Sequence, residues 1–164
     1  IYLANVLGVD MGMYYRRLDY SKMVKGRHPI AAYEFLGPKL EGKDVILIDD
    51  MISSGKSILE IASLLKKRGA GKIFICTTFG LFTEGMEKFD EAYQNGIFDK
   101  LLTTNLVYQT PELLSKPYYI TCDMSKYIAL IIDTLNHDMS VSHLLNPADR
   151  IKRCVSNYMA QYEK

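Results

Sequence analysis

The sequence predicts an α/β fold of three layers, α/β/α, in which helices cover both faces of a mostly parallel central sheet. Its apolar runs are rich in Ile and Val and are continuous rather than alternating, which is typical of strands buried on both faces. Segments of helical periodicity separate these runs, and a regular exchange of strands and helices favours parallel pairing. With 164 residues, 48% hydrophobic and 24% charged, the chain has the composition of one globular domain.

Five apolar runs are the predicted strands. They lie at residues 6–9, 45–48, 73–76, 101–107 and 118–122. We expect residues 45–48 to form a central strand of the sheet, with Asp49 at its carboxyl end.

The predicted helices follow from apolar residues spaced three and four apart. The two clearest sets are Ile58, Ile61, Ala62 and Leu65, and Ile128, Ile131, Ile132 and Leu135. The first of these helices ends near Lys66 and Lys67, with Gly69 as its C′ residue, because cations favour the negative end of the helix dipole. Residues 86–93 predict a further short helix that stops at Asn95.

Two more segments complete the chain. Asn146 and Pro147 predict the start of a C-terminal helix, whose apolar stripe is Ile151, Val155, Tyr158 and Tyr162. Residues 14–28 carry five basic side chains without a clean period, which predicts a long basic loop or hairpin.

Charge and hydropathy argue against two classes of partner. Twenty Lys and Arg oppose 19 Asp and Glu, so the net charge of +1 lacks the basic surplus of a nucleic-acid binder. The apolar runs are far shorter than the roughly 18 residues that cross a bilayer, and we find no secretory signal. The cysteines are three, Cys76, Cys122 and Cys154, an odd count in widely separated apolar surroundings. This pattern favours reduced, buried thiols over disulfides, so we expect a cytoplasmic protein.

The most informative segment is residues 45–57, V-I-L-I-D-D-M-I-S-S-G-K-S, which reads as a strand, two acids, a turn of small residues and a helix. Ligands of open α/β sheets collect at the carboxyl ends of strands. Backbone N–H groups, hydroxyls and an ammonium group in the turn suit a phosphate dianion, and the two carboxylates suit a vicinal diol. The segment therefore predicts a sugar-phosphate site formed by Asp49, Asp50, Ser53, Ser54, Gly55, Lys56 and Ser57.

This segment has two other interpretations. Acid pairs often end strands and Ser-Ser-Gly is an ordinary helix cap, so composition alone leaves a purely structural role open. A Walker A loop is excluded, because the glycine that should precede Gly55 by five residues would fall at Asp50.

The strand, acid pair and turn resemble the phosphoribosyl-diphosphate signature of the phosphoribosyltransferase-like fold. Five other motifs of the chain lie on either side of this segment. They are G-V-D-M-G at 8–12, V-K-G-R-H-P at 24–29, T-T-F-G-L-F-T at 77–83, L-L-T-T-N at 101–105 and M-S-V-S-H-L-L-N at 139–146. In this order and spacing they resemble the C-terminal half of the ribose-phosphate pyrophosphokinases, over about residues 3 to 146. The N-terminal domain of that family has no counterpart here.

The resemblance implies a role for each matching residue. It assigns the ribose hydroxyls to Asp49 and Asp50, and the 5-phosphate of ribose 5-phosphate to residues 53–57. It likens Asp10, Met11, Gly12 and Met13 to a diphosphate loop whose acid, Asp10, helps to hold Mg²⁺. It likens Lys25 and Arg27 to a catalytic pair on a flexible basic loop, whose charges stabilise the transferring phosphoryl group. From the residues alone, Asp10 could also cap a strand end, and residues 25–27 could belong to a solvated loop.

The activity that the resemblance implies is that of a ribose-phosphate diphosphokinase, which uses Mg²⁺ to transfer diphosphate from ATP to ribose 5-phosphate for nucleotide biosynthesis. We expect residues 1–146 to be the C-terminal domain of a longer, homo-oligomeric enzyme and 147–164 to be a helical tail. This chain alone should bind ribose 5-phosphate without normal turnover. We expect neither nucleic acid nor membrane as a partner.

Three positions depart from the family pattern. Met13 stands where the family usually has a second glycine, Lys56 replaces a small residue of the phosphate turn, and Phe79 stands where many members have His. These departures keep a non-catalytic regulatory relative open as an alternative. A type I phosphoribosyltransferase is the other alternative, although the chain has no spare segment for a hood over the nucleobase.

Overall fold

The computed structural model describes residues 1–18, 21, 23 and 30–162, and they form two compact units. One unit is Lys39–His137, and the other joins Ile1–Pro38 to Asp138–Lys164. Among the described residues, none of the helices has the length and hydropathy that a membrane crossing requires. The predicted boundary between residues 146 and 147 stays a prediction.

A parallel sheet of four strands lies in the unit Lys39–His137. The strands are β3 (Val45–Ile52), β4 (Ile73–Gly80), β5 (Lys100–Thr104) and β6 (Tyr119–Cys122), and they lie side by side in that order. The predicted α/β fold with a parallel sheet is therefore confirmed. The prediction that residues 45–48 are central is wrong, because β3 is at the edge and no described strand pairs with its outer side.

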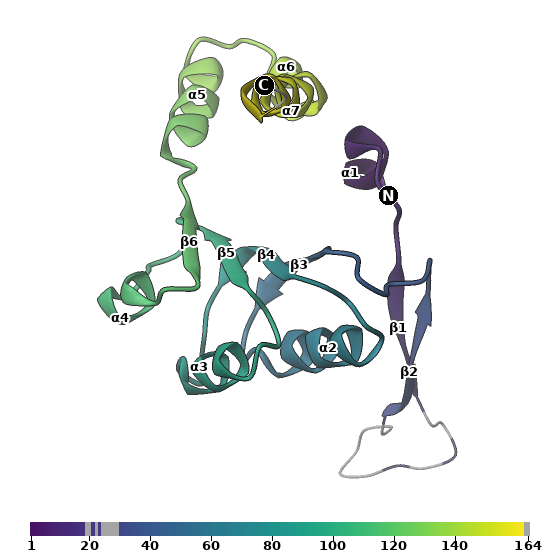
Figure 1. The fold of residues 1–164 in the computed structure, drawn as a ribbon. Coiled ribbons are helices and arrows are strands. Elements are labelled where there is room, and N and C mark those ends of the chain that lie inside the picture. The colour runs from purple at the N-terminus through teal and green to yellow at the C-terminus, as the bar shows by residue number, and fades with distance from the viewer. Residues whose placement is uncertain (19–20, 22, 24–29, 163–164) are drawn as a thin grey trace. The chain divides into compact units, whose positions relative to one another are not determined.

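Two helices cover one face of this sheet. Helices α2 (Lys56–Lys67) and α3 (Glu87–Gln94) lie side by side beneath it (Figure 1), as the periodicity predicts. The core between them and the strands is made of Ile58, Ala62, Leu65, Ile73, Ile75, Phe89 and Leu101. On the opposite face Ile46 and Ile48 are each 55% exposed. The helix α5 (Ser125–Asn136), also predicted, follows β6 and extends away from α2 and α3 (Figure 1).

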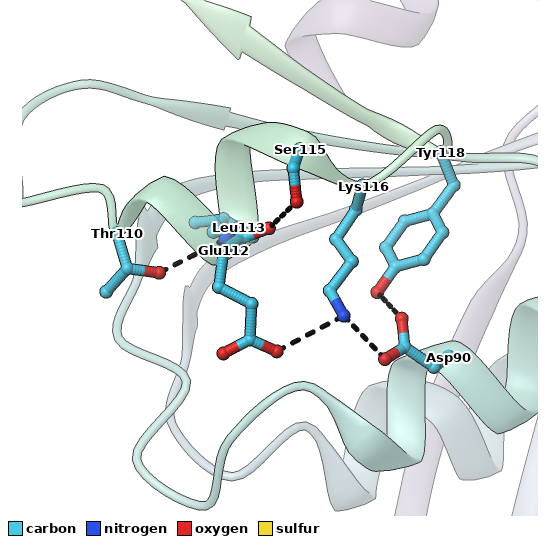
Figure 2. A network of polar contacts seen from close by, with 7 residues as sticks. All are labelled: Asp90, Thr110, Glu112, Leu113, Ser115, Lys116 and Tyr118. Atoms are coloured by element: carbon cyan, nitrogen blue, oxygen red, sulfur yellow. Dashed lines mark hydrogen bonds and ion pairs between the residues drawn. The ribbon is translucent and has the colours of Figure 1, made fainter.

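Helix α3 is held by a buried aromatic cluster and by an ion pair. Phe89 packs edge-on against Phe82 and Phe98, with ring centroids 5.3 and 6.4 Å apart. The next residue, Asp90, accepts hydrogen bonds from Lys116 and Tyr118, each at 2.7 Å (Figure 2). These contacts fix α3 to the chain that enters β6, so the position of Phe89 is set from both sides.

The short helix α4 (Pro111–Ser115) orients Lys116 for that ion pair. Thr110 caps the helix by accepting a hydrogen bond from the backbone N–H of Leu113 at 3.1 Å (Figure 2). Glu112 in its first turn lies 3.2 Å from the Lys116 ammonium. Lys116 therefore joins two carboxylates from separate helices.

The described residues of the second unit form a pair of antiparallel strands and three helices. The antiparallel strands are β1 (Met13–Leu18) and β2 (Ile30–Leu36), and the helices are α1 (Tyr2–Leu7), α6 (Ser142–Leu145) and α7 (Ala148–Tyr162). A hairpin was one of the two predicted forms of residues 14–28, and a C-terminal helix was predicted after Pro147. The strand predicted at residues 6–9 is wrong, because α1 extends to Leu7 and Gly8 ends it with a left-handed φ of 66°.

Candidate functional site

The predicted phosphate segment forms a continuous strand, turn and helix. Asp49 and Asp50 are exposed residues of β3, which continues to Ile52. Ser53 and Ser54 form the turn, and Gly55 is the N-cap of α2. The strand, turn and helix that the sequence predicts for these seven residues are therefore present.

Gly55 gives the turn its shape. Its φ of +79° lies in the left-handed region that glycine tolerates at little cost. A Cβ atom at this position would lie 2.3 Å from Cζ of Phe89 in α3. Both the conformation and the close approach therefore require glycine here.

Hydrogen bonds tie the turn to the chain that follows β4. The N–H of Thr83 donates to the carbonyl of Ser53 at 3.0 Å, and the N–H of Leu81 donates to the carbonyl of Ile52 at 2.8 Å. The hydroxyls of Ser53 and Thr83 are 3.4 Å apart. These contacts hold the turn in place against the chain that follows β4. The N–H groups of the turn begin a helix, so they have no carbonyl partner within that helix.

The electrostatics of α2 favour an anion at its first turn. This turn contains no acidic residue, and Lys66 and Lys67 lie in the last turn. The exposed Lys56 adds a positive charge to the positive end of the helix dipole. Its charge also reaches Glu84, whose pKa is lowered first by a hydrogen bond from Lys88, then by the charge of Lys88 and that of Lys56. The positive end of the helix dipole and Lys56 together suit an anionic ligand.

A row of polar residues crosses the sheet at the level of Asp49. Asp49 of β3 pairs in register with Thr77 of β4, Thr77 with Thr103 of β5, and Thr103 with Thr121 of β6. Thr77 is only 6% exposed, and its hydroxyl has no hydrogen-bond partner among the described residues. By contrast, the Thr103 hydroxyl lies 2.5 Å from that of Tyr119.

Asn105 organises the carboxyl ends of the last two strands. Its side-chain amide donates to Asp123 at 2.8 Å, and its carbonyl accepts from the N–H of Met124 at 2.8 Å. Hydrogen bonds from the hydroxyl and the N–H of Ser125, and then from Asn105, lower the pKa of Asp123. This arrangement fixes the start of α5.

The predicted diphosphate loop, Asp10 to Met13, belongs to the other compact unit. Asp10 and Gly12 are exposed, and Met13 is the first residue of β1. The ring of Phe35 lies against Gly12, where a Cβ atom would be 2.6 Å from Cε2. Lys25 and Arg27, the predicted catalytic pair, lie outside the described residues.

The donor chemistry of Asp10 fits the predicted Mg²⁺. Among the described residues, His, Cys, Asp and Glu do not gather in groups of three or more that could hold a metal ion. Mg²⁺ is commonly held by one or two carboxylates together with waters and the phosphates of a substrate, so it needs no such group. A carboxylate such as that of Asp10 is the oxygen donor that this ion prefers.

Thr77 and Asn105 are candidates that the sequence prediction missed. Both lie in motifs quoted above, T-T-F-G-L-F-T and L-L-T-T-N, but neither was given a role. Only the register of the strands shows that Thr77 is next to Asp49, and only the hydrogen bonds show what Asn105 holds.

Comparisons with known proteins find related sequences. The family model of the phosphoribosyl synthetase-associated domain matches residues 21–146. The ribose-phosphate pyrophosphokinase of Vibrio parahaemolyticus is 26% identical over 107 residues, which are 65% of this chain and 33% of that protein. The ribose-phosphate pyrophosphokinase of Thermococcus kodakarensis is 33% identical over 106 residues, 64% of this chain and 34% of its own.

A solved structure shows the same fold. The crystal structure of phosphoribosylpyrophosphate synthetase from Mycobacterium smegmatis matches with a TM-score of 0.58 and 21% identity, over 67% of this chain and 35% of that one. The chain spans about a third of the length of the curated relatives it matches. Since the family model covers well over half of the sequence, the chain belongs to the phosphoribosyl synthetase-associated domain family.

Proposed function

We propose that this chain is the ribose 5-phosphate-binding part of a ribose-phosphate diphosphokinase. The turn from Ser53 to Ser57 carries the proposal, since its left-handed Gly55 leads directly into a helix whose first turn has no acid. Backbone N–H groups at such a helix N-terminus suit a phosphate dianion, and Lys56 adds an ammonium group. Asp49 and Asp50 accept hydrogen bonds from the ribose hydroxyls.

In the proposed reaction the anomeric hydroxyl of ribose 5-phosphate attacks the β-phosphorus of ATP, and AMP leaves. Lys25 and Arg27 supply positive charge to the transferring group, which is how sites of this kind gain most of their rate. The Asp10 carboxylate would hold Mg²⁺, which would supply further positive charge to offset the negative charge of the phosphates.

The chain alone is proposed to bind without turnover, because it spans only about a third of its relatives. We propose that the full-length protein is a homo-oligomer of the cytoplasm. The expectation that the three thiols are buried is wrong, because Cys76 and Cys122 are half-buried and Cys154 is exposed. All three are free thiols, which suits a reducing compartment.

Calorimetric titration with inorganic phosphate and with ribose 5-phosphate tests the proposed site. Both should bind the wild-type chain, and Lys56→Gln should weaken both by removing the added charge. Lys67→Gln is the matched control, because it removes a lysine from the other end of the same helix. Absence of phosphate binding, or equal losses in the two variants, would refute the assignment of this turn.

A non-catalytic regulatory relative is the second candidate. The contact of Phe35 with Gly12 favours it, because the ring fills space beside the glycine of the predicted diphosphate loop. Formation of AMP from ATP and ribose 5-phosphate by the full-length protein separates the two candidates. A protein that binds ribose 5-phosphate but forms no AMP would be a regulatory relative.

A further inference from the structure

The hydroxyl of Thr77 is the buried polar group that the proposed site leaves unused. Thr77 is 6% exposed, and no described residue is a hydrogen-bond partner of its Oγ1. Buried hydroxyls are nearly always hydrogen-bonded, because an unpaired one keeps the cost of its desolvation. An unpaired hydroxyl at the ligand-binding edge of a sheet therefore needs an acceptor.

Strand register places Asp49 next to Thr77. Asp49 and Thr77 are Cα partners on adjacent parallel strands, so their side chains are neighbours on the same face of the sheet. On the other side, the Thr103 hydroxyl already contacts that of Tyr119 at 2.5 Å. A carboxylate is also the stronger acceptor, because a hydrogen bond to a charged group is about twice as strong as a neutral one.

We propose that Thr77 is a positioning residue, whose hydroxyl donates to the Asp49 carboxylate when that carboxylate turns to bind the ribose diol. The inference rests on the proposed function, since it needs ribose 5-phosphate at this site. Asp49 Oδ1 already accepts from the N–H of Asp50 at 2.9 Å. A hydrogen bond from Thr77 would restrict the carboxylate to a rotamer in which it also accepts from the sugar hydroxyls.

The proposed role of Thr77 concerns binding of the sugar and not binding of the phosphate. The 5-phosphate is bound by the turn at residues 53–57, which contains no part of Thr77. Loss of the Thr77 hydroxyl should therefore weaken binding of ribose 5-phosphate and leave binding of inorganic phosphate unchanged.

The test is calorimetric titration of the 164-residue chain with both ligands, in the wild type and three variants. Thr77→Val removes the hydroxyl at nearly constant side-chain volume, and Thr77→Ser keeps a hydroxyl at the same position. Thr121→Val is the matched control, because Thr121 is in the same row but donates to Gln109, at 3.2 Å. Thermal unfolding of each variant reports on the fold.

Thr77→Val should weaken ribose 5-phosphate binding about tenfold, the effect of one hydrogen bond to a charged group. Thr77→Ser and Thr121→Val should bind it as the wild type does, and Thr77→Val should unfold at no lower temperature, since it buries no unpaired hydroxyl.

Two results would overturn the role of Thr77 but not the proposed function. One is an unchanged affinity of Thr77→Val for ribose 5-phosphate, and the other is an equal loss of affinity for ribose 5-phosphate and for phosphate. A wild-type chain that binds phosphate but not ribose 5-phosphate would overturn the assignment of the sugar site, and the role of Thr77 with it.

Discussion

Gly55 and Phe89 are in such close contact that a Cβ atom on the glycine would lie 2.3 Å from Cζ of the ring. The glycine shapes the turn that we propose to bind phosphate, and Phe89 is a fully buried residue of the core. The proposed phosphate-binding turn and the hydrophobic core therefore meet at this pair.

Gly55→Ala should destabilise the chain and weaken phosphate binding. The left-handed backbone costs a residue with a Cβ atom about 1 kcal/mol, and the overlap with Phe89 adds about 1–3 kcal/mol. Gly96→Ala is the control, because Gly96 has a similar φ of +67° but nothing within 4 Å of its Cβ position. Urea unfolding of both variants separates the two costs, and equal losses in both would show that the Phe89 contact has no energetic weight.

Tyr118→Phe should lower the free energy of unfolding at pH 7 by about 1–3 kcal/mol, because Tyr118 donates to the Asp90 carboxylate. Tyr93→Phe is the control, since the two rings pack 4.9 Å apart and no comparable contact of the Tyr93 hydroxyl is seen in the described structure. Urea unfolding measures both.

The effect of Tyr118→Phe should depend on pH. Burial raises the pKa of Asp90, but the hydrogen bonds from Lys116 and Tyr118 and the charge of Lys116 outweigh it and hold the pKa below 3.8. A depressed folded-state pKa stabilises the protein above the unfolded-state value, and this contribution is lost as the pH falls through the folded-state value. The gap between Tyr118→Phe and the wild type should therefore narrow below about pH 4. A constant gap down to pH 2 would contradict the assigned cause.

Asn105→Ala should loosen the start of α5. The variant removes the donor to Asp123 and the acceptor for the N–H of Met124, so hydrogen exchange should accelerate at Met124 and Ser125. Asn95→Ala, at the end of α3, is the control. Unchanged protection of both amides would show that the β6–α5 junction is held by other contacts.

Lys25→Ala and Arg27→Ala should each reduce kcat of the full-length enzyme by about 10² to 10⁴-fold, with much smaller changes in KM, if both charges act on the transition state. Lys67→Ala, an exposed lysine at the end of α2, should leave kcat unchanged. Steady-state assays of AMP formation measure both constants. An increase in KM alone would show that Lys25 and Arg27 contribute to substrate binding only.

Local patterns predicted the elements of the unit Lys39–His137 well. The continuous apolar run at 45–48 and the period of residues 58–65 gave β3 and α2, because both depend on which neighbouring residues are buried. The left-handed conformation of Gly55 was also predictable. In a turn of small residues ahead of a helix, glycine is the residue that adopts a positive φ at least cost.

Features that depend on distant pairing were not predictable from these patterns. The run at 6–9 has the composition of a strand, but a run of four residues is also compatible with the last turn of a helix, and α1 takes that form. The position of β3 at the edge of the sheet was not predictable either, because strand order depends on which strands pair with one another. The contact of Asp90 with Tyr118 joins residues 28 apart and left no local signal.

The contact between Gly55 and Phe89 makes ligand affinity a reporter of core packing. Phe89 stacks edge-on with Phe82 and Phe98, so a substitution within this aromatic cluster displaces the surface against which the turn rests. Selection for ribose 5-phosphate binding would therefore also act on side chains that never touch the ligand. A screen for tighter or weaker binders should return positions inside the molecule as well as positions on its rim.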